Sequence, residues 1–539
     1  MIMNHPLLIK TILDRACRLF PKKEIYSRCL EKDYEYNYGA FYKRVCRLAN
    51  VLQKLGVKQG DVVGTFAWNT HRHMELYFAV TCLGAVLHTV NVRLFTDQLT
   101  YIINHAEDKL LFIDRDLLPI VEEVAENLET VQNYIIMTEP EELPETSLDP
   151  VLNYEKLLEN APDDFIFPDD LDENTTAALC YTSATTGLPK GVRYTHRAIY
   201  LHALTLSTPD AIGISEKDAV LAVVPMFHVF SWGFPFAAAL MGSKLILPGN
   251  DLSPPALCGL IEQERATLVA GVPTIWNNIY RHLESGAEYD LSSLRYILNG
   301  GAAISRFLVE AFEKKYGITV RGTFGMTEAT PVAITCPIKS YLEGLPEDEK
   351  FNLKTKQGML LPGLEMKVID DDGNEIKWDD REMGELLLRG PWIASEYYKD
   401  PERSAETFKN GWYHSGDIVS VDEEGYVTVQ DRAKDLIKSG GEWISSLDLE
   451  NKIMAHPAVE EAAIIAIPDI KWQERPLACI VLKANEKDKI DEQDILNFLQ
   501  DKVAKFWIPD RVVFVEEVPK TSVGKFNKNA LRDRFSGTE

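Results

Sequence analysis

The sequence predicts an α/β protein. We expect a large N-terminal domain, with two βαβ-type sheets and a small β-barrel, and a small α+β C-terminal domain. Apolar runs of strand length alternate with segments of helical apolar spacing as far as residue 316, and short strands with Asp-Gly and Glu-Gly turns follow from Gly358. At 539 residues the chain is too long for one hydrophobic core, so at least two domains are expected.

The first βαβ unit occupies the N-terminal part of the chain. Its predicted helices span residues 11–20, 40–55, 71–83 and 97–106, and its predicted strands span residues 61–68, 84–89 and 110–113. Gly56 directly follows the second helix, where a left-handed residue is favoured. An acidic stretch with prolines, residues 139–172, interrupts the alternation and is predicted to be an excursion on the surface.

A second βαβ unit then begins. Its predicted strands span residues 177–181, 219–224, 244–247, 268–270 and 296–299, and its predicted helices span residues 197–206, 233–241, 254–264, 274–284 and 305–316. Ligands of open parallel sheets bind beyond the C-terminal ends of the strands. We therefore look for a functional site in the loops that follow these strands.

The last third of the chain has a different pattern. Barrel strands are predicted over residues 365–369, 384–389 and 426–429. The α+β domain that follows has predicted helices over residues 446–456 and 491–505 and predicted strands over residues 459–467, 477–482 and 511–516. We place the boundary between residues 1–431 and residues 432–539.

Composition excludes several classes of protein. The net charge of −25 argues against nucleic acid as a partner, which would require a basic face. The eight cysteines form no C-x-x-C pair and no cluster with histidine, so neither a disulfide framework nor a zinc site is expected, and reduced thiols in a cytosolic enzyme fit best. The N-terminus is predicted to be an amphipathic helix and not a signal peptide.

The longest apolar run, residues 219–242, is long enough to raise the question of a membrane span. Pro225, His228 and Pro235 interrupt it, so we predict a strand, a turn and a buried helix and keep a membrane span as the minor alternative.

One loop has the composition of a polyphosphate site. The segment Tyr181-Thr-Ser-Ala-Thr-Thr-Gly-Leu-Pro-Lys-Gly191 follows an apolar strand and combines four hydroxyls, a glycine and a lysine. Hydroxyls, free backbone N–H groups and an ammonium suit phosphate oxygens. The spacing does not match the P-loop G-x-x-x-x-G-K-[ST], and an ordinary polar surface loop is the alternative.

Further segments follow in a fixed order. They are Val-Pro-Met-Phe-His-Val-Phe-Ser-Trp (224–232), Gly-Gly-Ala-Ala (300–303), Gly-Met-Thr-Glu (325–328), Trp-Tyr-His-Ser-Gly-Asp (412–417), Asp-Arg-Ala-Lys-Asp-Leu-Ile-Lys (431–438), Ser-Gly-Gly-Glu-Trp (439–443) and Pro-Lys-Thr-Ser-Val-Gly-Lys (519–525). Over essentially its whole length the chain resembles the adenylate-forming superfamily of acyl-CoA synthetases, luciferases and peptide-synthetase adenylation domains. The 224–232 and 439–443 segments look most like medium- and long-chain fatty acyl-CoA synthetases.

This resemblance implies a two-step reaction. A fatty acid carboxylate attacks the α-phosphate of ATP to give acyl-AMP and pyrophosphate; the small C-terminal domain then moves, and the thiol of coenzyme A displaces AMP. ATP, Mg²⁺ and coenzyme A are the implied cofactors and co-substrates. The resemblance also implies a cytoplasmic homodimer without a transmembrane segment, and it leaves peripheral membrane contact open.

The resemblance assigns roles to residues of this chain. The implied nucleotide- and cofactor-binding residues are Thr182, Ser183, Thr185, Thr186, Gly187, Lys190, Gly301, Ala302, Gly322, Thr323, Phe324, Gly325, Thr327, Asp417, Arg432, Lys434, Lys438 and Trp443. The hydroxyl residues of the loop and Lys190 would hold phosphates, and Gly187 would free the loop backbone. Asp417 and Arg432 would bind the ribose, and Lys434 would be the hinge. Taken singly, most of these residues would be read as solvated loop residues.

The implied catalytic residues are Lys525, His228 and Glu328. Lys525 would stabilise the charge that develops on the α-phosphate, and Glu328 would bind Mg²⁺ with Thr182. His228, Val229 and Trp232 would border the acyl group, although a lone His or Trp in an apolar stretch is more often a core residue.

Two residues depart from the family pattern. Ala184 stands where glycine is usual, which would add backbone strain if the position requires a positive φ. Phe324 stands where tyrosine is more frequent, so stacking on adenine is kept and a hydroxyl contact is lost.

Several other functions remain open. A CoA ligase for another hydrophobic or aromatic acid is the main alternative, and luciferase-like chemistry on the adenylate is not excluded. The few residues after Lys525 leave no room for a carrier domain, which disfavours a peptide-synthetase module. A lipid-binding or membrane protein built around residues 219–242 would leave the hydroxyl-rich loop, Glu328 and Lys525 unexplained.

Overall fold

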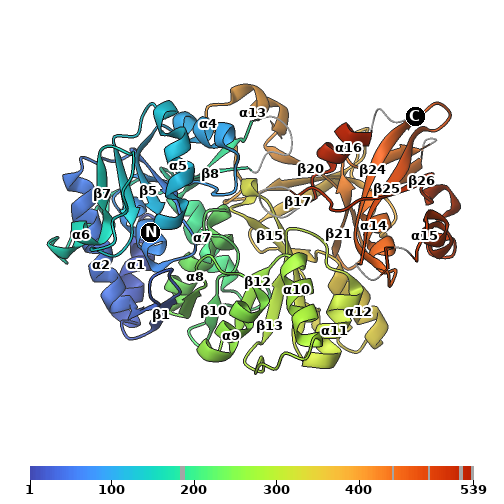
Figure 1. Ribbon diagram of the computed structural model, residues 1–539, viewed down its shortest axis with the longest axis horizontal. Coiled ribbons are helices and arrows are strands. Elements are labelled where there is room, and N and C mark those ends of the chain that lie inside the picture. The colour runs from blue at the N-terminus through green and yellow to red at the C-terminus, as the bar shows by residue number, and fades with distance from the viewer. Residues whose placement is uncertain (183–187, 440–441, 484–485, 488, 521–525, 536–539) are drawn as a thin grey trace.

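A computed structural model describes residues 1–539 except 183–187, 440–441, 484–485, 488, 521–525 and 536–539 (Figure 1). The described residues form four sheets. Two large sheets make up most of the molecule, and a smaller sheet lies between them and the C-terminal α+β region, which is drawn in orange to red in Figure 1. The predicted α/β class, with a separate small C-terminal domain, is confirmed.

The first large sheet has seven strands in the order β7-β6-β5-β3-β4-β8-β9. All neighbours are parallel except β8 and β9, which form an antiparallel pair. The strands are β3 (Val62–Phe66), β4 (Val86–Thr89), β5 (Asp108–Asp114), β6 (Asn133–Met137), β7 (Val151–Asn153), β8 (Thr176–Tyr181) and β9 (Gly191–Thr195). Its helices are α2 (Tyr38–Lys54), α3 (His71–Cys82), α4 (Thr96–Ala106), α5 (Leu118–Val124) and α6 (Tyr154–Glu159).

The second large sheet has nine strands in the order β16-β15-β14-β13-β12-β10-β11-β1-β2. They are β1 (Glu24–Ser27), β2 (Tyr34–Asn37), β10 (Ala219–Leu221), β11 (Lys244–Leu247), β12 (Leu268–Gly271), β13 (Tyr296–Asn299), β14 (Thr319–Gly325), β15 (Val332–Thr335) and β16 (Met359–Leu360). Helix α7 (His196–Leu206) connects β9 of the first sheet to β10, and the helices that follow strands of the second sheet are α8 (Phe234–Met241), α9 (Pro254–Glu264), α10 (Pro273–Glu284), α11 (Arg306–Tyr316) and α12 (Glu347–Thr355). The central strands are parallel, and both ends are antiparallel.

The main hydrophobic core joins the two large sheets through shared helices. It contains residues of α1 (Ile9–Leu19), α2, α3, α7 and α8 together with strands from both sheets. Every residue of α3 is buried, and α8 is buried from Phe234 to Leu240. Helix α8 is apolar on all sides, as expected inside a core, whereas α3 buries Arg72 and Glu75 as ion pairs with Glu155 and Arg44. Figure 1 shows α7 and α8 between the sheets, and α8 starts directly after the 229–233 turn described below.

A five-stranded antiparallel sheet occupies the position of the predicted barrel. It comprises β17 (Glu365–Ile369), β18 (Gly384–Arg389), β19 (Phe408–Lys409), the long strand β20 (Trp412–Val421) and β21 (Val427–Arg432), and α13 (Pro401–Thr407) leads into it. Beyond β21, a second five-stranded sheet contains β22 (Ile437–Ser439), β23 (Glu442–Ile444), β24 (Val459–Asp469), β25 (Gln473–Leu482) and β26 (Arg511–Phe514). Helices α14 (Ser446–Met454), α15 (Glu492–Leu499) and α16 (Lys528–Phe535) accompany this sheet.

The structure corrects several details of the expected organisation. The stretch predicted to be a surface excursion contributes the edge strand β7 and helix α6, so this prediction is wrong in part. Strands β1, β2 and β6 were not predicted; β1 and β2 are short, and polar residues in them weaken the apolar signal. Helix α15 ends at Leu499, before the predicted residue 505. In the described part of the chain, no helix is both long and apolar enough to cross a membrane.

Candidate active site

The loops singled out by sequence come from different sheets. The β8–β9 hairpin belongs to the seven-stranded sheet, the segments after β13 and β14 belong to the nine-stranded sheet, and β20 and β21 belong to the five-stranded sheet beside them. Hydrogen bonds between these segments bring several of the predicted residues together.

The base of the β8–β9 hairpin fixes the two ends of the predicted phosphate loop. The Thr182 N–H donates to the Lys190 carbonyl at 2.9 Å, and the Lys190 N–H donates to the Thr182 hydroxyl at 3.1 Å. Ser183, Thr185, Thr186 and Gly187, as well as Ala184, lie outside the described residues. Thr182 and Lys190 therefore face each other across the entrance to this loop.

Glu328 and Lys190 meet at one tyrosine hydroxyl. The hydroxyl of Tyr397 donates to Glu328 Oε1 at 2.7 Å, and Lys190 Nζ lies 3.0 Å from the same hydroxyl oxygen and 4.2 Å from the centre of the tyrosine ring. Glu328 is only 6% exposed. Burial lowers the pKa of the Lys190 amine, an effect that the charge of Glu328 opposes. Burial and the neighbouring Glu328 raise the pKa of Tyr397, so its hydroxyl stays a donor.

Sequence analysis missed Tyr397. It lies in a coil segment between β18 and α13, far in sequence from Lys190 and Glu328, and its backbone N–H is held by the Ser404 hydroxyl at 2.8 Å. A tyrosine in such a segment has no distinguishing pattern in a single sequence. Only the tertiary contact identifies it.

The oxygen atoms near Lys190 are of the kind that Mg²⁺ prefers. Glu328 provides a buried carboxylate and Thr182 a hydroxyl, both hard oxygen ligands. Within the described ranges, no group of three or more His, Cys, Asp or Glu residues is arranged to hold a metal ion. This donor set fits an ion that takes its remaining ligands from phosphates and water, which is the usual way in which proteins bind Mg²⁺.

The segment after β13 passes very close to its neighbours. A side chain at Gly300 would place its Cβ 2.5 Å from the Trp232 ring and 2.5 Å from the Thr323 hydroxyl, so only glycine fits there. The Asn299 side-chain N–H donates to the Ala302 carbonyl at 3.0 Å, and the Thr323 hydroxyl donates to the Asn299 carbonyl at 3.0 Å. Gly300, which directly precedes Gly301, therefore lies between Trp232, predicted to border the acyl group, and Thr323, predicted to bind the nucleotide.

The glycines at the end of β14 are required by backbone packing. A Cβ at Gly322 would lie 2.8 Å from the Lys356 carbonyl oxygen, and one at Gly325 would lie 2.1 Å from the Pro331 carbonyl oxygen. Phe324, between them, is half-buried, and Thr327 is buried with its carbonyl accepting from the Tyr194 hydroxyl at 2.7 Å. These glycines keep β14 close to the segments beside it.

The segment after His228 is a left-handed turn. Positive φ angles occur at Val229 (42°), Phe230 (54°), Ser231 (50°) and Trp232 (55°). The i, i+4 spacing of His228 and Trp232 therefore does not place them on one face of a right-handed helical turn. Left-handed conformations cost L-residues about 1–2 kcal/mol each, so surrounding contacts must hold this turn in place.

Hydrogen bonds and burial supply those contacts. The Ser231 hydroxyl donates to the Val224 carbonyl at 2.6 Å, and the His228 N–H donates to the Pro225 carbonyl at 3.1 Å. Val229 and Trp232 are buried, with Trp232 8% exposed, whereas His228 is half-buried. The turn presents Trp232 to Gly300.

A narrow cavity of about 10 Å³ lies behind this turn. It is lined by Tyr194, Ile199, His202, Phe230, Gly233, Phe236 and Thr330. Burial lowers the pKa of His202 to about 3, and its Nε2 accepts from the Val332 N–H at 3.2 Å, so this histidine is neutral. Apart from the neutral His202 and the Thr330 hydroxyl, aromatic and aliphatic groups dominate the lining.

Asp417 and Arg432 form a second charged pair in the candidate site, and the charge of Glu328 also acts on Arg432. They are paired across β20 and β21, and Arg432 Nε lies 2.7 Å from Asp417 Oδ1. Asp417 is 2% exposed, and its charge raises the pKa of Arg432. A buried carboxylate beside a guanidinium has the polar character that sugar hydroxyls require.

The remaining predicted residues lie in or next to the C-terminal region. Lys434 is exposed in the segment after β21, and partial burial of its amine lowers its pKa. Lys438 and Trp443 face each other across the β22–β23 hairpin, with Lys438 Nζ 4.6 Å from the centre of the Trp443 ring. Lys525 lies outside the described residues.

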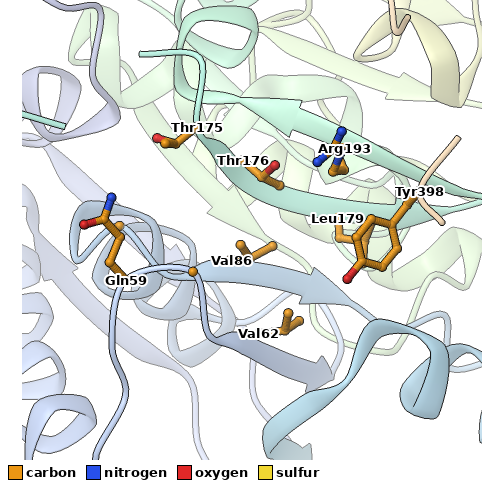
Figure 2. A pocket seen from close by; sticks show the side chains of 10 residues that line it. Gln59, Val62, Val86, Thr175, Thr176, Leu179, Arg193 and Tyr398 are labelled. Atoms are coloured by element: carbon orange, nitrogen blue, oxygen red, sulfur yellow. The ribbon is translucent and has the colours of Figure 1, made fainter. Parts of the chain in front are cut away.

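A larger cavity of about 510 Å³ lies away from the predicted residues (Figure 2). Its floor is the face of the seven-stranded sheet formed by β3, β4 and β8, and Figure 2 shows Tyr398 and Arg193 at one end of it. It is lined by Gln59, Gly60, Val62, Gly84, Val86, Thr175, Thr176, Leu179, Arg193 and Tyr398, none of which was predicted to bind a ligand. Cavity size alone therefore does not locate the candidate site.

Comparison with known proteins adds independent information. Residues 13–398 match the family model described as AMP-binding enzyme, and residues 448–525 match the one described as AMP-binding enzyme C-terminal domain. A long-chain-fatty-acid–CoA ligase of Thermus thermophilus is 46% identical over 99% of this chain and 96% of its own length. A 3-methylmercaptopropionyl-CoA ligase of Ruegeria lacuscaerulensis is 41% identical over 99% of this chain and 98% of its own length.

The fold is shared with solved structures. A crystal structure of an anthranilate CoA ligase in complex with anthranoyl-AMP superposes with a TM-score of 0.87 at 25% identity, covering 99% of this chain and 98% of the other.

The close packing at Gly325 leads to a stability prediction. Gly325→Ala should lower the free energy of unfolding by about 1–3 kcal/mol, because its Cβ would collide with the Pro331 carbonyl oxygen 2.1 Å away. Gly344→Ala is the matched control, since a Cβ there meets nothing within 4 Å, and it should change stability by no more than about 0.5 kcal/mol. Equal denaturant midpoints for the two variants would contradict the packing account.

Proposed function

The chain belongs to the AMP-binding enzyme family, and from this premise we propose that it is an ATP-dependent fatty acid–CoA ligase. Its substrate would be a medium- or long-chain fatty acid, and its products acyl-CoA, AMP and pyrophosphate. The observation that carries the proposal is the meeting of Lys190, Tyr397 and Glu328 at one hydrogen-bonded centre.

The first half-reaction would take place at this centre. An oxygen of the fatty acid carboxylate attacks the α-phosphorus of ATP, the bond to the β-phosphate oxygen breaks, and pyrophosphate leaves. Lys190 and Thr182, with the loop between them, would bind the β- and γ-phosphates, while Asp417 and Arg432 would orient the ribose. Glu328 and Thr182 would hold Mg²⁺, which when bound neutralises phosphate charge. Tyr397 would keep the Glu328 carboxylate oriented beside Lys190.

The adenine and acyl groups would lie on two sides of the Gly300 contact. Gly301, Ala302 and residues 322–325 would surround the adenine. Trp232, Val229 and the apolar residues behind the left-handed turn would form the wall of the acyl site. His228 would lie near the carboxylate.

A hydrocarbon chain suits this apolar wall, because each buried methylene contributes about 0.8 kcal/mol. In the structure the cavity behind the turn is narrow, about 10 Å³. Room for an alkyl chain would therefore require the turn and its aromatic side chains to move. Positive φ angles at four consecutive residues support the idea that the turn has a second conformation.

The second half-reaction would involve the small domain, residues 432–539. The coenzyme A sulfur attacks the acyl carbonyl, the bond to the AMP phosphate oxygen breaks, and AMP leaves. We propose Lys434 as the hinge, because it lies in the segment between β21 and β22 that joins the two domains, and Lys438 and Trp443, on the hairpin that follows, as residues beside the coenzyme A path. Lys525 would act in the first half-reaction, where an ammonium stabilises the developing charge.

We also propose that the protein is a cytoplasmic homodimer. The exclusively free cysteines support a reducing compartment, and the dimer rests on the family resemblance. Light scattering of the purified protein measures the oligomeric state, and a mass of one chain would contradict the dimer.

For the identity of the acid substrate, one observation favours a second candidate. The relative that is named as a 3-methylmercaptopropionyl-CoA ligase favours a short, hydrophobic acid as the second candidate. Pyrophosphate release should be measured with a series of straight-chain, branched and aromatic acids, with and without coenzyme A. Highest kcat/KM with medium- or long-chain fatty acids supports the proposal. Highest kcat/KM with a short or aromatic acid supports the alternative, and no release with any acid contradicts both.

Lys525→Ala should separate the two half-reactions. Acid-dependent pyrophosphate release should fall by about a hundredfold or more, the scale of losing one transition-state donor. Thioester formation from supplied acyl-AMP and coenzyme A should continue. Equal losses in the two half-reactions would contradict the assigned role.

Glu328→Gln should raise the Mg²⁺ concentration needed for adenylation, because an amide is a weaker ligand than a carboxylate. The measurement is a Mg²⁺ titration of pyrophosphate release, with the melting temperature recorded in parallel. Glu349→Gln, at an exposed position of α12, is the matched control and should behave like the wild-type protein. A Mg²⁺ titration curve for Glu328→Gln that overlays the control would exclude Glu328 as a ligand.

Trp232→Ala should leave ATP binding largely intact and change the preference for acid chain length. The acids should range from about four to about eighteen carbons. Full burial of the added methylenes would contribute about 11 kcal/mol across this series, so a change in the acyl site should be visible as a change in chain-length preference. If Trp232 is only a core residue, the variant instead loses about 3–5 kcal/mol of stability while the ratio of mutant to wild-type kcat/KM stays constant along the series. A constant ratio would therefore contradict a role in the acyl site.

A further inference from the structure

Helix α16 directly follows the segment that contains Lys525 and begins with a buried lysine. Lys528 Nζ lies 2.7 Å from Glu450 Oε1 on α14 and donates to the Ser446 hydroxyl at 2.5 Å. The side chains of Lys528 and Glu450 are 12% and 5% exposed. Glu450 also accepts from the Ile464 N–H of β24 at 2.8 Å. The first residue of α16 is therefore attached to a helix and a strand of the small domain.

The same contacts continue into the large domain. The Ser446 N–H donates to Asp431 Oδ2 at 2.7 Å, and the Ser446 hydroxyl donates to the same carboxylate. Asp431 precedes Arg432 on β21 and faces Ile418 of β20, the residue next to Asp417. Lys528, Ser446 and Asp431 thus connect α16 to the two strands that carry the Asp417–Arg432 pair.

A second cation on α16 reaches the segment between the domains. Arg532 lies four residues after Lys528, on the same face of the helix. It forms an ion pair with Asp435 at 2.6 Å and donates to the Lys434 carbonyl at 3.3 Å. Leu531, fully buried, packs α16 on the small sheet. Apolar packing of Leu531 therefore holds α16 on the small sheet, and the ion pairs of Lys528 and Arg532 hold it on its other side, where Arg532 contacts the linker between β21 and β22.

The charge of Lys528 is maintained despite its burial. Burial alone would lower the pKa of this amine, but Glu450, Asp431 and Asp435 together raise it above its ordinary value. A buried ammonium with good partners is a rigid attachment, since moving it would leave charges unpaired.

We propose that Lys528 and Arg532 are positioning residues for adenylation: they fix the start of α16 against β21 and the segment of Lys434 and Asp435, and only two residues join this start to Lys525. The inference rests on the proposed function, in which Lys525 acts at the α-phosphate. Lys525 precedes Lys528 by three residues, so their Cα atoms can be no more than about 11 Å apart. A small shift of the start of α16 would therefore displace Lys525, and misplacement by about 1 Å can cost a hundredfold in rate.

The test measures the two half-reactions in Lys528→Met, Lys528→Arg and Arg532→Gln. Lys528→Met should slow adenylation, measured as acid-dependent exchange of pyrophosphate into ATP, by about tenfold or more, while thioester formation from supplied acyl-AMP stays close to wild type. Lys528→Arg, which keeps the charge, should recover much of the loss. Lys489→Met, at an exposed lysine of the same domain paired with Glu486, is the matched control and should leave both rates unchanged.

A double variant shows whether Lys528 acts through Lys525. If Lys528 acts through Lys525, adding Lys528→Met to the Lys525→Ala variant should not lower the adenylation rate further. If Lys528→Met instead causes a general structural defect, the two losses of adenylation rate should add. Additive losses, or equal losses in the two half-reactions, would overturn the proposal. If Lys528→Met does not fold, Arg532→Gln decides: a selective loss of adenylation supports the proposal, and a wild-type rate overturns it. A wild-type protein that forms no acyl adenylate would instead contradict the proposed function itself.

Discussion

The hydroxyl of Tyr397 connects the parts of the molecule that the proposed chemistry needs. It donates to Glu328 after β14 of the nine-stranded sheet, and it lies beside Lys190 at the base of the hairpin from the seven-stranded sheet. Tyr397 itself belongs to the coil that leads toward the five-stranded sheet. Without the tyrosine hydroxyl between them, the Lys190 ammonium and the Glu328 carboxylate would form a direct ion pair. With the tyrosine between them, the ammonium and the carboxylate are both kept at the junction and available to a ligand that has its own charges.

The contact between Trp232 and Gly300 joins the two halves of the proposed substrate site. A Cβ at Gly300 would be 2.5 Å from the Trp232 ring, so the left-handed turn and the segment after β13 are closely packed. A movement of either segment would therefore displace the other. Backbone strain in the turn is offset by buried hydrogen bonds and aromatic packing, such as that of Phe230 against Tyr77, with ring centres 4.9 Å apart. This coupling gives a physical route by which a bound nucleotide could change access to the acyl site.

Much of the architecture could be predicted from the sequence, because apolar periodicity is a local property. Helices such as α3 and α9 and strands such as β11 and β13 were expected within a few residues of their observed bounds. The strand, turn and buried helix of residues 219–242 were predicted, but the left-handed conformation of the turn was not, since it depends on tertiary contacts and the turn contains no glycine before Gly233. Tyr397 and the Lys528 network were missed for the same reason: their partners are distant in sequence. The resemblance assigned Gly322 and Gly325 to the nucleotide site, and the structure shows that a side chain at either position would collide with neighbouring backbone. The motif pattern predicted Thr182, Lys190 and Glu328 as site residues, but their arrangement relative to one another could be obtained only from the structure.

The central claim is that this junction transfers an adenylyl group to a carboxylate. The most direct measurement uses a fatty acid whose carboxylate is labelled with oxygen-18, incubated with ATP, Mg²⁺ and coenzyme A, followed by mass spectrometry of the products. If the carboxylate oxygen attacks the α-phosphorus and thiolysis then breaks the acyl–oxygen bond, each AMP released carries one labelled oxygen and pyrophosphate carries none. Label in pyrophosphate or phosphate, or unlabelled AMP formed together with acyl-CoA, would contradict the account.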